Sequence, residues 1–117
     1  MLCLDTYALI EIHDANPKFS GLLAKDCVIA DLTLAEFYGV LLRRFNKKTA
    51  DYWLDRLAGL IVRTDMETYI AAIVQKQGNP SLSFFDCVGY AYARQHHHQF
   101  VTGDKEFKGK QGVLFLK

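Results

Sequence analysis

The sequence lacks a long apolar run, a paired-cysteine motif, a low-complexity tract and a strong excess of either charge. No stretch approaches the roughly 18 consecutive apolar residues that a membrane-spanning helix needs. The N-terminal MLCLD has no basic region and no cleavage site, so we expect no signal peptide and a cytoplasmic protein. Because no proline- or serine-rich linker and no internal repeat divides the 117 residues, we expect a single domain, 1–117.

The few cysteines argue against a disulfide-linked protein, and the composition argues against a disordered one. Cys3, Cys27 and Cys87 are odd in number, far apart and set among apolar residues. They are therefore interpreted as reduced, small hydrophobic residues rather than disulfide partners. With 50% hydrophobic and 23% charged residues the composition is that of a globular protein, and a net charge of +1 identifies no partner by itself.

Five short apolar runs have the composition of strands that are buried on both faces. Helical patterns separate them, which is typical of a parallel sheet covered by helices on both sides. The runs are Leu2–Asp5, Cys27–Ala30, Leu60–Thr64, Gln99–Thr102 and Gly112–Leu116. The sequence thus predicts the α/β class, as a three-layer α/β/α domain with a central, mainly parallel, five-stranded sheet.

The helices are marked by apolar residues at i, i+3, i+4 and i+7 spacing. One such stripe covers Leu34–Phe45, and another covers Met66–Val74 and stops at a Gly-Asn-Pro turn. Further helices are expected after Asp5, after Lys48 and over 83–95.

Four acidic residues stand out because each follows or interrupts an apolar stretch where a strand or loop meets a helix or turn. They are Asp5, Glu36, Asp86 and Asp104. Asp5 ends the first predicted strand, and Asp104 follows the strand Gln99–Thr102 across one glycine. The other two acids fall in the first turn of predicted helices. Ligands of open parallel sheets bind beyond the carboxyl ends of the strands, so all four acids are expected to converge there. Oxygen-only ligands favour Mg²⁺ or Mn²⁺ over zinc, which predicts a divalent-metal phosphodiesterase site.

Helix capping is the competing interpretation of these acids. Thr33-x-x-Glu36 reads as a capping box and Ser83-x-x-Asp86 as its aspartate version, and each acid taken alone is more often a cap than a ligand. Asp5 and Asp104 likewise have the local sequence of turn residues. The combination of all four acids favours a metal site.

The same segments resemble a known family. LDTYALIE, LAEF, LSFFD and FVTGDKEF occur in the order and with the flanks of PIN domains, and more narrowly of the small VapC-type ribonuclease toxins of toxin–antitoxin pairs. The resemblance covers the whole chain and implies a PIN-like fold with Asp5, Glu36, Asp86 and Asp104 as catalytic metal ligands. It also implies Thr6 and Thr102 as supporting hydroxyl groups.

By the same resemblance, the protein is expected to be an Mg²⁺- or Mn²⁺-dependent endoribonuclease. It would leave a 5′-phosphate and a 3′-hydroxyl, form a homodimer and pair with a small antitoxin. The chain departs from the family at Phe85, Cys87 and Gly89, where smaller or aliphatic side chains are usual, and this affects packing rather than ligation.

Other polar residues are weaker candidates. Arg43 shares a helix face with Glu36 and, with Lys105, is a candidate RNA contact; the alternative for Arg43 is a helix-end arginine. Glu106 is interpreted either as a group that supports the metal ligands from behind or as a side chain that points away from the site. The tract His96, His97, His98 is interpreted as a helix end rather than a metal site, because adjacent residues point in different directions. We expect Glu11, His13 and Asp14 to be solvated.

Alternative functions remain to be separated. A PIN-type nuclease of RNA processing or decay has the same motifs. A receiver-like Mg²⁺-binding phosphate switch also gathers acids at strand ends, but its central phospho-acceptor aspartate is missing from the middle strands. A haloacid-dehalogenase phosphatase needs Asp-x-Asp where this chain has Asp5-Thr6-Tyr7. A non-catalytic binding relative is disfavoured because all four acids are present.

Overall fold

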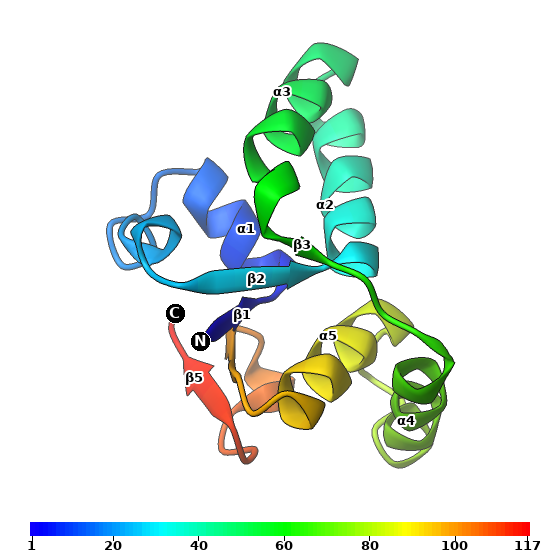
Figure 1. Ribbon diagram of the computed structural model, residues 1–117. Helices are drawn as coiled ribbons and strands as arrows, with labels where there is room; N and C mark the ends of the chain where they lie inside the picture. Colours follow the sequence, from blue (N-terminus) through cyan, green and yellow to red (C-terminus); the bar gives the residue numbers. More distant parts are fainter.

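A five-stranded sheet forms the centre of the molecule (Figure 1). The computed structural model describes all residues, 1–117. The strand order is β3-β2-β1-β4-β5 and every neighbouring pair is parallel. The strands are β1 Leu2–Leu4, β2 Cys27–Ala30, β3 Ile61–Val62, β4 Gln99–Thr102 and β5 Val113–Phe115. The predicted three-layer α/β/α class is confirmed.

All five predicted helices are present, and three short 3₁₀ turns precede strands β2, β3 and β5. The helices are α1 Thr6–His13, α2 Asp31–Arg44, α3 Lys47–Leu57, α4 Met66–Gly78 and α5 Phe84–Gln95. The 3₁₀ turns are η1 Leu22–Ala24, η2 Ala58–Leu60 and η3 Lys105–Phe107. Figure 1 shows α2 and α3 side by side as a hairpin that projects away from the sheet, while α4 lies against the outer side of α5.

Three strands, β1, β3 and β5, are shorter than predicted. The first two are shortened for reasons outside the local pattern. β1 ends at Leu4 because the side chain of Asp5 already accepts the Thr6 N–H at 2.8 Å as the N-cap of α1. β3 has only two residues because Leu60 belongs to η2, and the Thr64 hydroxyl donates instead to Asp31 Oδ1 at 2.6 Å.

Each face of the sheet has its own hydrophobic core, which explains why the strands are apolar throughout. Side chains alternate between faces along a strand, so Leu4 and Val101 join the core beneath α1 and α2, whereas Cys3 and Phe100 join the core beneath α5. Complete burial of a side chain such as Phe100 contributes roughly 1.5–3 kcal/mol.

The cysteines belong to these cores, as predicted. Cys3, Cys27 and Cys87 are all buried and unpaired. Burial, with the nearby Asp5 carboxylate, raises the pKa of the Cys3 thiol to about 12, so this thiol stays neutral. None of the helices combines the length and apolar character needed to cross a bilayer.

Candidate metal centre

The site lies where the strand order reverses. β1 has β2 on one side and β4 on the other, so the chain leaves these neighbouring strands in different directions beyond their carboxyl ends. Such a switch point leaves a crevice in an open parallel sheet. Asp5 follows β1 directly, and Asp104 follows β4 across Gly103. Leu4 is paired with Val101, which places Asp5 beside Thr102.

Asp5 is the most enclosed of the four acids, with 2% of its surface exposed. One carboxylate oxygen accepts the Thr6 N–H at 2.8 Å, and the other accepts the Thr102 hydroxyl at 2.7 Å. Burial, followed by the charge of Asp86, raises the pKa of Asp5 to about 8, against the opposing effect of the two hydrogen bonds. A cation beside this carboxyl group would favour its ionised form.

Glu36 is not a helix cap, so the predicted Thr33–Glu36 capping box is wrong. The helix α2 starts earlier than the sequence pattern suggested, at Asp31, with Ala30 of β2 as the N-cap residue; Thr33 is buried inside the helix at 1% exposure. Glu36 therefore lies in the second turn rather than the first. Its Oε1 accepts the Thr6 hydroxyl at 2.6 Å, and burial raises its pKa.

Asp86 does cap its helix, as predicted. Its N–H donates to Ser83 Oγ at 3.1 Å, and its Oδ2 accepts the Ser83 N–H at 3.3 Å. Burial nevertheless raises the pKa of Asp86, and the charge of Asp104 adds to that shift against the Ser83 hydrogen bonds. Asp86 therefore both caps α5 and lies near other carboxylates.

Asp104 is fixed by the turn that follows β4. It caps η3 by accepting the Glu106 N–H at 3.0 Å, and its own N–H donates to the Thr102 hydroxyl at 3.1 Å. The preceding residue must be glycine, because a Cβ on Gly103 would collide with the Leu116 carbonyl and the Tyr7 ring.

The structure brings the four acids to one region, although not as a formed metal cage. The charge of Asp86 raises the pKa of both Asp5 and Glu36, and Asp104 acts likewise on Asp86. In the side-chain positions described, no three His, Cys, Asp or Glu groups are placed to share one ion. The carboxylates engage neighbouring hydroxyl and N–H groups instead. Their chemistry fits a hard cation, which prefers oxygen ligands and would relieve the repulsion, once the side chains turn toward it.

The candidate supporting groups fall into two sets. Thr6 and Thr102 bond directly to the acids. Glu106 does not join them in the structure: its carboxylate is exposed and accepts the Ser81 hydroxyl at 3.1 Å. Arg43 and Lys105 are exposed, and the charge of Arg43 lowers the pKa of Glu36 against the burial effect, so Arg43 is close to the site.

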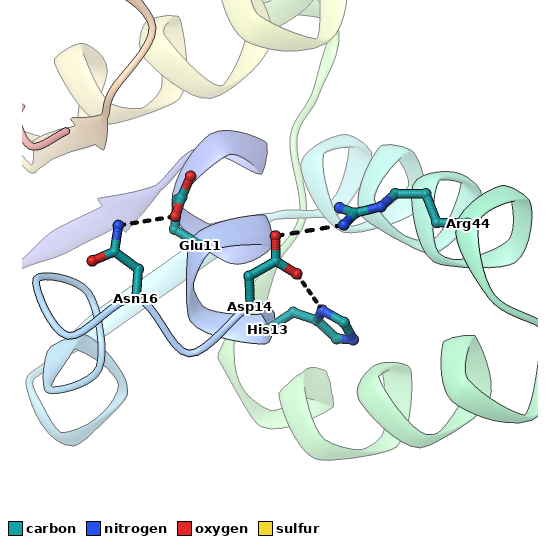
Figure 2. A network of polar contacts seen from close by, with 5 residues as sticks. All are labelled: Glu11, His13, Asp14, Asn16 and Arg44. Carbon is teal, nitrogen blue, oxygen red and sulfur yellow. Dashed lines mark hydrogen bonds and ion pairs between the residues drawn. The ribbon is translucent and has the colours of Figure 1, made fainter.

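Three residues that we expected to be solvated, Glu11, His13 and Asp14, also make polar contacts (Figure 2). Asp14 is exposed as expected, whereas Glu11 and His13 are partly buried. Asp14 accepts from His13 at 2.8 Å and pairs with Arg44 at 3.5 Å, while Asn16 donates to Glu11 at 2.9 Å. The hydrogen bond from His13 and the Arg44 charge hold the pKa of Asp14 below its usual value. The network ties the end of α1 to the end of α2. Arg44 is distant from Asp14 in sequence, so local patterns did not indicate this ion pair.

The histidine tract lies where α5 ends. The rings of Tyr92 and His96 stack with centroids 4.2 Å apart, and His97 adopts a positive φ of 58°. Burial lowers the pKa of His98, as do the nearby N-terminus and the other two histidines.

The α/β/α architecture and the acid-lined switch point define the class of this domain. The chain belongs to the PIN domain family, whose sequence model matches residues 2–112. The PIN resemblance of the motifs is thereby confirmed. No curated protein matches the chain.

Solved structures share the fold at low sequence identity. VapC20 of Mycobacterium tuberculosis, described as a sarcin–ricin loop cleaving toxin, has a TM-score of 0.81 at 17% identity, over 100% of this chain and 99% of that one. A toxin–antitoxin complex from Klebsiella pneumoniae has a TM-score of 0.77 at 19% identity, over 97% and 96%. VapBC2 of Rickettsia felis, bound to a promoter DNA fragment, has a TM-score of 0.76 at 15% identity, over 98% and 96%.

Proposed function

We propose that this protein is a divalent-metal-dependent endoribonuclease and the toxin of a toxin–antitoxin pair. The observation that carries the proposal is the convergence of Asp5, Glu36, Asp86 and Asp104 at the switch point of a PIN domain, with Asp5 almost completely buried. A buried carboxylate beside others is costly unless a cation accompanies it. Mg²⁺ and Mn²⁺ are the cations suited to such ligands.

The residues of the chain have distinct tasks in this proposal. Asp5, Glu36, Asp86 and Asp104 would hold the metal. A bound divalent ion lowers the pKa of a water molecule and neutralises charge on the phosphate and the leaving oxygen. Thr102 orients the Asp5 carboxylate and Thr6 orients Glu36 through the hydrogen bonds described above.

Arg43 and Lys105 supply positive charge on the exposed rim, where RNA phosphates would approach. Cleavage would leave a 5′-phosphate and a 3′-hydroxyl. Buried, unpaired cysteines suit the reducing cytoplasm, the compartment proposed for the protein.

The biological role is proposed from the proteins that share the fold. They include a toxin described as cleaving the sarcin–ricin loop, and toxin–antitoxin complexes. We therefore propose a small cognate antitoxin as partner. A PIN nuclease of RNA processing remains the alternative, and expression in a host separates the two: a toxin arrests growth, and co-expression of its antitoxin, sought in the adjacent gene, restores it.

A second copy of the chain is the other proposed partner. The helix α4 exposes one apolar face with no neighbour, made of Met66, Ile70, Ile73 and Val74, each between 53% and 68% exposed. The face is uncharged and therefore self-compatible, as a two-fold interface requires. Sedimentation should give a dimer for wild type and a monomer for Ile70→Glu/Ile73→Glu; a wild-type monomer contradicts the proposal.

The nuclease proposal is tested with purified protein and end-labelled RNA. Cleavage should require Mn²⁺ or Mg²⁺, stop with EDTA and give 5′-phosphate ends. Asp5→Asn and Asp104→Asn should each abolish it. The matched control is Asp55→Asn, because Asp55 is an exposed carboxylate on α3. Wild-type rates for both site variants would remove the acidic quartet from the mechanism.

A further inference from the structure

Two partly buried aromatic side chains are left outside the cores. Every other partly buried aromatic residue packs against one of the two hydrophobic clusters, but Phe85 and Phe115 pack against neither. Both lie at the acidic edge of the sheet: Phe85 directly precedes Asp86, and Phe115 ends β5. Aromatic rings placed beside a site without serving the core are available to a ligand.

The sheet register fixes the position of Phe115 relative to the acids. Phe115 is paired with Thr102, whose hydroxyl bonds to Asp5. Paired residues of neighbouring parallel strands project from the same face, so Phe115 lies on the face that carries Thr102 and Asp5. Since strands are about 4.8 Å apart, Phe115 is two strand spacings, roughly 10 Å, from Asp5. That separation is one to two nucleotides of an extended RNA strand.

A cation accompanies this ring. Lys108 Nζ is 5.5 Å from the centroid of Phe115, and the lysine is exposed. Lys108 directly follows η3 and Asp104 directly precedes it, so the same short segment joins the cation to the acidic site. An aromatic surface next to a flexible ammonium group matches the alternation of base and phosphate along a nucleic acid strand.

We propose that Phe115 and Lys108 form a nucleotide subsite beside the acidic quartet, where an unpaired base stacks on the Phe115 ring and Lys108 contacts the adjacent phosphate. The inference rests on the proposed ribonuclease function and adds two residues that would hold the substrate strand beside the scissile bond. Stacking accepts every base, so the subsite selects for unpaired structure more than for sequence.

The test is the affinity for a fluorescent, unpaired 12-nucleotide RNA, measured by anisotropy in Ca²⁺, which we expect to support cleavage poorly. Phe115→Leu keeps an apolar side chain but removes the stacking surface, and should weaken binding about 5- to 100-fold. Phe115→Trp should retain wild-type affinity. Lys108→Ala should also weaken binding and lower the salt dependence, by about 0.7 in the slope of log K against log salt.

The control is Phe45→Leu. Phe45 has the same chemistry, with the Arg44 guanidinium 5.3 Å from its ring centroid, but it lies nine residues beyond Glu36 along α2, about 13 Å along the helix axis. The affinity of the Phe45→Leu variant for the RNA should equal that of wild type. Melting curves confirm that each variant is folded; if Phe115→Leu is not, Phe115→Trp and Lys108→Ala carry the test.

The outcomes separate this inference from the proposed function. If wild type binds and cleaves RNA, but Phe115→Leu and Lys108→Ala bind the RNA as tightly as wild type does, that result overturns the subsite alone. Equal weakening by Phe115→Leu and Phe45→Leu does the same, because it reveals general apolar adhesion. An RNA duplex bound as tightly as the single strand contradicts the selection for unpaired RNA. Wild type that neither binds nor cleaves RNA overturns the proposed function together with the subsite.

Discussion

The hydroxyl of Thr102 donates a 2.7 Å hydrogen bond to Asp5 Oδ2, although the two residues are 97 positions apart in the chain. The same hydroxyl oxygen accepts the N–H of Asp104 at 3.1 Å. One threonine side chain therefore holds two of the four acids, which follow the adjacent strands β1 and β4, in fixed relation. It is completely buried, so water cannot replace it.

Thr102→Val should accordingly destabilise the protein and impair the site. Valine has nearly the same shape but leaves a buried Asp5 oxygen and the Asp104 N–H without their partner. An unsatisfied buried group costs about 1–3 kcal/mol, which urea denaturation would detect. Thr102→Ser keeps the hydroxyl and is the matched control, with a smaller loss from the missing methyl group. Equal stability of the valine variant and wild type would contradict this role.

Glu36→Gln removes the negative charge of Glu36 but keeps the shape of the side chain. Glutamine Oε1 can still accept the Thr6 hydroxyl, and no cap is disturbed because Glu36 lies inside α2. We expect unchanged or slightly higher stability, since burial already raises the pKa of Glu36. RNA cleavage should fall by more than about a hundredfold, because groups that merely orient metal ligands cost about 10- to 100-fold when changed. Activity within a few-fold of wild type would exclude Glu36 as a ligand.

The sequence predicted the elements whose signals are local. The Ser83–Asp86 capping box, the Gly-Asn-Pro end of α4 and the acids after β1 and β4 are all encoded by neighbouring residues. The start of α2 was missed because Ala30 provides no side-chain cap; the helix continues directly from β2. Figure 2 shows the other limit, since Arg44 meets Asp14 only after α1 and α2 have packed.

The sequence likewise predicted which residues form the candidate site, but it did not predict the hydrogen bonds that they make. Four acids in apolar settings indicated one locus, because parallel strands bring their carboxyl ends to one edge. The present hydrogen bonds of each carboxylate were not foreseeable. They depend on which hydroxyl the folded chain brings near: Thr6 to Glu36, and Thr102 to Asp5. The Phe115–Lys108 pair also needed the β4–β5 register, which no local pattern specifies.

The stability of the metal-free protein should change with pH in the direction opposite to the one that acidic residues usually cause. The pKa of Asp5 is raised from 3.8 to about 8 on folding, so between these values the native state binds more protons than the unfolded state. Stability then falls as pH rises through this window. In EDTA, the melting temperature should decrease from pH 5.5 to pH 8. Asp5→Asn, which does not titrate, should flatten the decrease, and an unchanged slope in that variant would contradict the assignment to Asp5.

Divalent metal should reverse this loss at neutral pH. A ligand that binds only the native state stabilises it by RT ln(1 + [L]/Kd), about 2.7 kcal/mol at a hundredfold excess over Kd. The gain comes from relieving repulsion among carboxylates whose pKa values are raised by burial and by one another. Millimolar Mn²⁺ or Mg²⁺ should therefore raise the melting temperature, and EDTA should reverse the effect. A variant with all four acids changed to their amides should not respond to metal and should melt at or above metal-free wild type, since the repulsion is gone. Identical melting of wild type with and without metal would show that these carboxylates do not act as one site.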